Sequence, residues 1–198
     1  MMKKKKNKKL TRLIMVLGIL LIAASAVTVV FTQTAQKNAA EEARQTAEYL
    51  LTLMPEIQAG APDGRTDTQM PVIELKGTDF AGVMEVPVYD TTLPMGNTWS
   101  RHSVSKHPCR FSGSPYDSSL ILGGSGNQGQ FGFMKWITGG DLVTVTDMTG
   151  LRFSYLVSDV LKTKDVSSEN LLSLDADLVL FAGNGFSADY TVVLCHRK

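Results

Sequence analysis

An uncharged apolar run near the N-terminus, Leu13–Phe31, constrains this chain more than any other feature. A helix of that length, rising 1.5 Å per residue, reaches about 28 Å and matches the roughly 30 Å hydrocarbon core of a bilayer. Seven of the 20 Lys and Arg residues stand in the first twelve positions, and such a basic flank stays in the cytoplasm. We therefore expect a cytoplasmic segment over residues 1–12, a transmembrane helix over residues 13–32 and an extracellular remainder.

A cleaved signal peptide is the alternative interpretation of the same run, since Ala23–Ala26 offers small residues to a signal peptidase. The apolar run continues past this point and is longer than the usual 7–15 residues of a signal core, which favours the uncleaved anchor. Both interpretations export the rest of the chain to a compartment where disulfides can form.

Without its basic start, the chain has 13 basic against 19 acidic residues, a balance that argues against nucleic acid as a partner. Apolar residues make up 43% and charged residues 20%, which excludes a disordered acidic chain, a collagen-like repeat and a multi-span membrane protein. Two cysteines are too few for a miniprotein built on disulfides.

Residues 33–71 are predicted to be an extracytoplasmic spacer helix followed by a linker. The helix is indicated over Ala39–Met54, where Ala43, Ala47, Leu50, Leu51 and Met54 form an apolar stripe. The stretch Ala59–Met70 is rich in Gly, Pro, Asp and Thr and has no periodicity, which is typical of a linker. The remaining residues, 72–198, are enough for one hydrophobic core.

Short apolar or alternating runs separated by turn residues predict that this domain is mainly β. The expected strands are Gly82–Val88, Ser119–Leu122, Leu142–Thr146, Phe153–Val160, Asp177–Phe181 and Tyr190–Cys195. Only Phe131–Ile137 and Ser168–Leu172 suggest helices, and both are short. Many closely spaced strands with minor helices favour a closed or nearly closed β-barrel.

Two weak motifs could indicate a dinucleotide site and a zinc site, but their sequence context argues against both. Gly124–Gly129 matches the dinucleotide pattern G-x-G-x-x-G, but the helix after it is too short for a βαβ crossover, so we expect no cofactor. Cys109 and Cys195 each have a nearby histidine, His107 and His196, but zinc spacings such as C-x₂-C are missing and no metal is expected. A disulfide and two buried thiols both remain open. Strand alternation would point Cys195 and His196 to opposite faces, so we expect no Cys–His dyad within one pair.

A family resemblance emerges from the order of the strand motifs. The run Leu120–Gly123 precedes Gly124, a Phe-containing segment and the turn Gly140-Asp141. The aromatic strand Phe153–Val157 follows, and the last two runs are Leu178–Gly183 and Tyr190–Cys195. From about Met84 onward the chain resembles sortases, the membrane-anchored cysteine transpeptidases of Gram-positive bacteria. Pro87–Tyr89 and Pro108–Ser114 resemble segments of the clostridial-type members.

The resemblance implies a sortase-like barrel and also shows where this chain departs from the family. Matched by motif, the family's catalytic cysteine falls on Gly183, its histidine on Gly124 and its arginine on Tyr190, while the threonine before the cysteine falls on Ala182. Glycine offers neither nucleophile nor acid, and groups that act as a unit fail together. The expected protein is therefore a pseudosortase rather than an enzyme.

Three hypotheses follow for its function. The first is a scaffold that binds sorting-signal peptides, surface or pilin-like subunits or an active sortase, with Ser125, Ala182, Asn184 and Tyr190 lining a peptide groove. The second is a transpeptidase or hydrolase with a relocated site, although Ser125, Asn184 and Ser187 have no histidine or lysine nearby in the motif. The third is a decayed gene product without a selected role.

Overall fold

The computed structural model describes residues 8–60, 69–183 and 189–198. The chain divides into two compact units, Met1–Asn38 and Ala39–Lys198. The first unit holds most of helix α1, which runs from Lys8 to Leu53. Within the first unit, the large apolar side chains of α1 from Leu13 to Phe31 are exposed, and that of Phe31 is 75% exposed. The helix is long and apolar enough to cross a membrane. One helix thus contains both the predicted membrane span and the predicted spacer.

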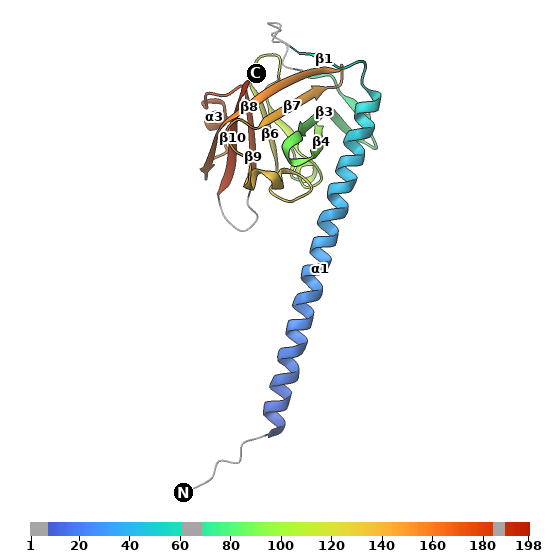
Figure 1. The fold of residues 1–198 in the computed structure, drawn as a ribbon, viewed down its shortest axis with the longest axis vertical. Coiled ribbons are helices and arrows are strands. Elements are labelled where there is room, and N and C mark those ends of the chain that lie inside the picture. The colour runs from blue at the N-terminus through green and yellow to red at the C-terminus, as the bar shows by residue number, and fades with distance from the viewer. Residues whose placement is uncertain (1–7, 61–68, 184–188) are drawn as a thin grey trace. The chain divides into compact units, whose positions relative to one another are not determined.

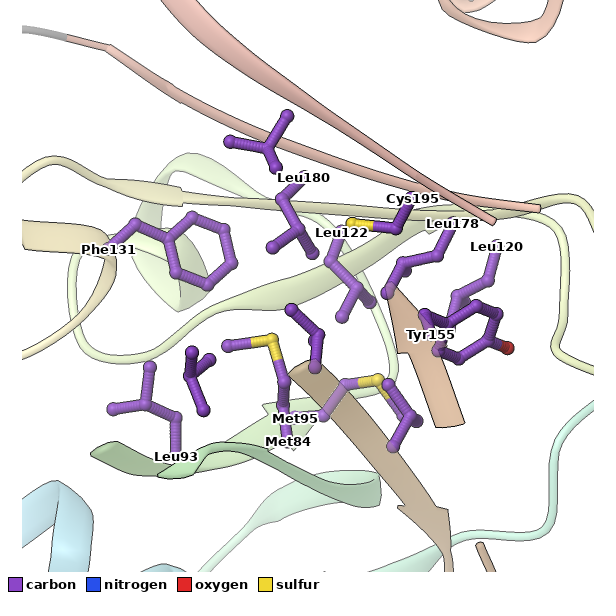
Figure 2. Close-up of a cluster of buried hydrophobic side chains, with 14 of the residues drawn as sticks. Met84, Leu93, Met95, Leu120, Leu122, Phe131, Tyr155, Leu178, Leu180 and Cys195 are labelled. Atoms are coloured by element: carbon purple, nitrogen blue, oxygen red, sulfur yellow. The ribbon is translucent and has the colours of Figure 1, made fainter. Parts of the chain in front are cut away.

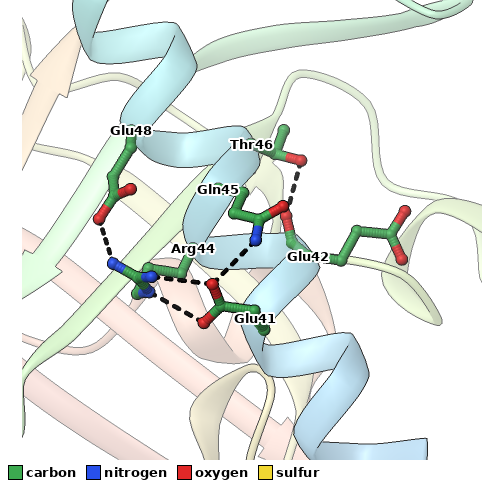
Figure 3. Close-up of polar contacts among 6 residues, drawn as sticks. All are labelled: Glu41, Glu42, Arg44, Gln45, Thr46 and Glu48. Carbon is green, nitrogen blue, oxygen red and sulfur yellow. Dashed lines mark hydrogen bonds and ion pairs between the residues drawn. The ribbon is translucent and has the colours of Figure 1, made fainter.

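The last part of α1, from Ala39 to Leu53, belongs to the second unit, and one face of it packs on the rest of that unit. Ala43, Ala47 and Leu50, spaced by three and four residues, are buried as the apolar stripe predicts. Arg44 lies on the exposed side, where its guanidinium donates to the carboxylates of Glu41 at 2.8 Å and Glu48 at 2.5 Å (Figure 3). Water screens exposed ion pairs of this kind and they contribute little to stability, so burial of the apolar face holds this segment in place.

Eight strands of the second unit close into a barrel in the order β8-β10-β9-β6-β5-β4-β3-β7, and β7 pairs again with β8 (Figure 1). Their bounds are β3 Thr78–Val86, β4 Thr91–Gly96, β5 Cys109–Ser112, β6 Leu120–Ser125, β7 Leu142–Asp147, β8 Leu151–Thr163, β9 Leu178–Gly183 and β10 Tyr190–Arg197. Two short strands, β1 (Gln58–Ala59) and β2 (Ile73–Leu75), extend the sheet beside β8 and β3. The predicted closed β-barrel is confirmed.

Within the described residues, four short helical segments connect the strands. They are η1 (Pro87–Tyr89), α2 (Arg101–Val104), η2 (Phe131–Lys135) and α3 (Ser168–Leu172). The prediction of a helix over 168–172 is confirmed, whereas the segment from Phe131 is a 3-10 helix that ends at Lys135. Its side chains Phe131, Phe133 and Met134 are buried in the barrel, so packing selects this short form.

Alternation along the strands divides their side chains between an inner and an outer layer. The inner layer fills the barrel with residues such as Leu122, Leu178, Leu180 and Cys195 (Figure 2). The outer layer covers β6, β9 and β10 with a second cluster that includes Ile121, Val179, Phe181, Val192 and Leu171 of α3. The two layers make β9 apolar on both faces, and its residues Leu178–Ala182 are all buried.

Candidate functional site

Strands β6, β9 and β10, which contain the motif positions Gly124, Gly183 and Tyr190, are neighbours in the barrel. Strands β6 and β9 are parallel, with Ser125 opposite Gly183, and β10 runs antiparallel to β9, with Tyr190 opposite Gly183. Ser125, Gly183 and Tyr190 therefore form one row across three strands, which we call the outer row. Gly124 and Thr191 both lie opposite Ala182 in the adjacent row, which we call the inner row.

The two rows face opposite sides of the sheet, because side chains alternate along each strand. Ala182 belongs to the cluster inside the barrel, and a Cβ added at Gly124 would meet Phe131 of the same cluster. A Cβ added at Gly183 would instead meet the ring of Tyr190, which packs with the outer cluster. Gly124 and Gly183 are thus close in space but point to different faces.

The space on the inner side of Gly124 is already filled. A Cβ at this position would lie 2.9 Å from Cδ2 of Phe131 and 3.2 Å from Oε1 of Gln130. Gln130 is held there, because its Oε1 accepts a hydrogen bond from the Ser125 N–H at 2.8 Å and its Nε2 donates to the Val104 carbonyl at 3.0 Å. The inner row therefore has no room for an imidazole at residue 124.

The outer row lies beside a cluster of aromatic rings. Trp99 packs against Phe111 and Phe181 with ring centroids 5.3 and 5.2 Å apart, and Phe181 lies 6.3 Å from Tyr190. Gly123 is required below Trp99, because a Cβ there would come within 2.2 Å of the indole ring. Trp99 and Tyr190 are only partly buried, so this side of the row offers aromatic surface to a ligand.

The outer row contains one hydroxyl, one phenol and bare backbone. The Ser125 Oγ accepts a hydrogen bond from the Asn127 N–H at 3.3 Å. A Cβ on Gly183 would lie 3.4 Å from Cε1 of Tyr190, an ordinary van der Waals contact. Asn184 and Ser187, which also belong to the expected site, lie outside the described residues.

Both cysteines are free and buried, so of the two alternatives for this pair the structure has separate thiols. Cys109 is on β5 and Cys195 on β10, with β6 and β9 between them. Three strand spacings amount to about 14 Å, whereas a disulfide needs Cα atoms within about 7 Å. The expected separation of Cys195 from His196 is confirmed, since Cys195 is buried and His196 is exposed, with its Nδ1 3.7 Å from Asp177.

Cys109, unlike Cys195, lies close to its neighbouring histidine in the sequence. Its Sγ lies 3.5 Å from Nδ1 of His107, and the thiol donates to the His107 carbonyl at 3.4 Å. Only Pro108 stands between the two residues, and His107 precedes the first residue of β5. Burial raises the pKa of Cys109 to about 12 and lowers the pKa of His107. Both groups are therefore neutral, the opposite of a thiolate–imidazolium pair.

The barrel shares its fold with sortases of known structure. Sortase C1 from Streptococcus agalactiae superimposes with a TM-score of 0.54 and 21% identity over 63% of this chain and 70% of that one. Sortase C from Clostridium perfringens SM101 gives 0.53 and 15% over 83% and 88%. Sortase E1 from Streptomyces coelicolor, solved with a tripeptide in its active site, gives 0.51 and 15% over 60% and 88%. No family model matches the sequence, and no curated protein is significantly similar to it.

The sequence did not point to three residues that shape this region: Trp99, Gln130 and Phe131. Trp99 reaches Gly123 from a loop more than twenty positions earlier, so no local pattern could reveal the contact. The one sequence feature that could have indicated these contacts is the pair Gly123 and Gly124, because glycine is needed where an aromatic ring packs directly on a strand backbone. Among the described residues, no three His, Cys, Asp or Glu side chains are grouped to hold a metal ion.

Proposed function

We propose that this protein is a single-pass membrane protein with a cytoplasmic N-terminus, whose extracellular sortase-fold domain binds a peptide at the outer row and does not cleave it. The single observation that carries the proposal is the register of Ser125, Gly183 and Tyr190 on one face of three adjacent strands. Three residues on one face of adjacent strands are close enough to act together, as the cysteine, histidine and arginine of a sortase must. These three residues lack a thiol, an imidazole and a guanidinium.

The three residues of the outer row support the proposal of an inert site. Sortase chemistry uses a thiolate to attack a peptide carbonyl, an imidazolium to protonate the leaving amine and a guanidinium to stabilise the oxyanion. Gly183 has no nucleophile, and the hydroxyl of Ser125 cannot replace an imidazole as acid and base. Tyr190 can donate one neutral hydrogen bond but brings no positive charge.

The register also changes the residue that we assign to the histidine position, from Gly124 to Ser125. A nucleophile and its base must lie within hydrogen-bond reach, which on adjacent strands requires the same face. Ser125 is directly opposite Gly183, whereas Gly124 faces Phe131 inside the barrel. The proposed site therefore comprises Ser125, Gly183 and Tyr190, with Trp99 at its side, and Asn184 remains a candidate from the sequence.

The ligand that we propose is the sorting-signal peptide of a surface or pilin-like protein, held for an active sortase nearby. Bare backbone at Gly183 lets a peptide chain approach closely, and the partly exposed rings of Trp99 and Tyr190 supply apolar contact. The tripeptide in the active site of the Streptomyces sortase is a precedent on the same fold.

An enzyme with a relocated site is the second candidate, favoured only by the contact between Cys109 and His107. Burial opposes it, because Cys109 is fully buried and its raised pKa keeps the sulfur protonated near neutral pH.

The test is to titrate the detergent-solubilised full chain into fluorescent sorting-signal peptides, following binding by anisotropy and cleavage by mass spectrometry in the same samples. We expect saturable binding without peptide cleavage. Tyr190→Ala should weaken binding about tenfold, or about 1.4 kcal/mol. Tyr49→Ala, which removes an exposed tyrosine from α1, is the matched control and should leave affinity unchanged. Peptide hydrolysis or an acyl adduct on the protein would contradict inactivity, and equal losses in both variants would remove Tyr190 from the site.

A further inference from the structure

Two apolar side chains of the second unit stand out by their exposure. Val88 of η1 and Trp136, directly after η2, are each 63% exposed, more than any other large apolar side chain in the described part of residues 39–198. Neither is close in sequence to the outer row. Single exposed apolar side chains are normal on a protein surface, and an indole is the largest of them, with an apolar ring and one polar N–H.

Tyr89 ties these two segments together and holds them in place. Its hydroxyl donates to the carbonyl of Trp136 at 2.6 Å, and its ring stacks on Phe133 at 5.9 Å. The Trp136 N–H in turn donates to the Phe133 carbonyl at 2.9 Å. The backbone of Trp136 is therefore fixed while its indole stays in solvent, so the exposure is built into the fold.

The second unit is tethered to the predicted membrane span by a short stretch of chain. Ala39, the first residue of this unit, follows Phe31 by eight positions in the sequence. Within the second unit, the loop before η2 packs on α1, since a Cβ at Gly129 would lie 3.0 Å from the nitrogen of Ala40 and 3.2 Å from its Cα.

We propose that Val88 and Trp136 contact the headgroup region of the bilayer that this chain's own apolar run crosses, an inference that rests on the anchor in the proposed function. Tryptophan prefers the membrane–water interface because its indole is apolar with one polar N–H. Lys135, exposed beside Trp136, adds attraction to anionic lipids. A weak contact suffices, because the anchor keeps the domain at a high effective concentration near the surface.

The experiment uses the full chain reconstituted in vesicles of phosphatidylcholine and phosphatidylglycerol, with and without bromine on the upper part of the acyl chains. The chain has two tryptophans, Trp99 and Trp136, so Trp136→Phe leaves only the indole that packs among the aromatic rings. We expect brominated lipid to lower the emission of Trp136, taken as wild type minus Trp136→Phe, by about twofold, and to leave Trp99 unchanged. Val88→Ser should reduce the quenching.

Flotation of the vesicles separates the two claims. Protein that floats with the vesicles but keeps an unquenched Trp136 overturns the surface contact and leaves the anchor intact. Protein that does not float overturns the anchor and with it the contact. A Trp136 emission that changes only when a protein is added to the vesicles also overturns the proposal, in favour of a protein partner.

Discussion

The inner and outer faces of β6 and β9 differ in the side chains that cover them, although the inner and outer rows are consecutive positions along each strand. On the inner side, Gly124 lies against Phe131 and Gln130, and the space is closed by packing and by two hydrogen bonds of the Gln130 amide. On the outer side, Gly183 lies under the ring of Tyr190 at ordinary contact distance, and Ser125 is partly exposed. The inner row is closely packed, whereas the residues of the outer row are partly exposed.

This difference shows that two glycines in equivalent-looking motifs have different roles. Gly124 is required by the fold, because a larger residue would displace a buried ring. Gly183 is not required by packing, because a Cβ added there would make only an ordinary contact with Tyr190.

The first prediction concerns the reactivity of the two native thiols toward alkylation. Cys195 is inside the barrel and Cys109 lies beside His107, yet both should react equally slowly. Burial raises the pKa of each to about 12, so each thiolate is scarce at pH 8. Alkylation by iodoacetamide should be about a thousandfold slower in the folded chain than in the unfolded chain, because the pKa differs by about three units. Intact mass should show two adducts in denaturant. Rapid native labelling of Cys109 would favour the relocated active site.

The second prediction compares one substitution on each face. Gly124→Ala forces a Cβ against Phe131 and should lower the free energy of unfolding by about 1–3 kcal/mol. Gly183→Ala places its Cβ in ordinary contact with Tyr190 and should change that free energy by no more than about 0.5 kcal/mol. Denaturant unfolding of the two variants in one detergent measures both. Equal losses would mean that the two glycines do not face different environments.

The third prediction is a pH dependence from His107. Desolvation lowers its pKa in the folded state, so the unfolded chain binds more protons and stability is lost as the pH falls below the ordinary histidine value. The slope contributed by one group is at most about 1.4 kcal/mol per pH unit between roughly pH 6.5 and 5. His107→Gln should flatten the unfolding free energy in this window, while His102→Gln, at an exposed position, should not. An unchanged slope in His107→Gln would contradict the burial argument.

Much of the barrel could be predicted from the sequence because alternation and turn residues mark most strands. The segments of β6, β9 and β10 were found within a few residues of their bounds. Strand β4 was missed because Pro94 stands inside it, a residue usually excluded from sheets. Proline is tolerated there because β4 pairs with β5 only at Gly96 and Cys109.

The site could be predicted only in part, and the missing information is the register. The motif match brought Gly124, Gly183 and Tyr190 to neighbouring strands, but it could not fix which face each one presents. Two consecutive glycines, Gly123 and Gly124, have no side chains whose polarity would reveal alternation, so the sequence could not show whether Gly124 or Ser125 is in register with Gly183. The contacts of Trp99 and Gln130 depend on loops that only the folded chain brings close.

The most direct test of the account is the acidity of a thiol introduced on the outer row. Gly183→Cys can be combined either with Ser125→His or with Gly124→His, and the pH dependence of alkylation then gives the pKa of the new thiol. We expect Ser125→His to lower that pKa by about one unit or more, because the imidazole then shares a face with the sulfur. Gly124→His should leave the pKa unchanged and destabilise the barrel. A lowered pKa with Gly124→His and none with Ser125→His would contradict the outer row as the site.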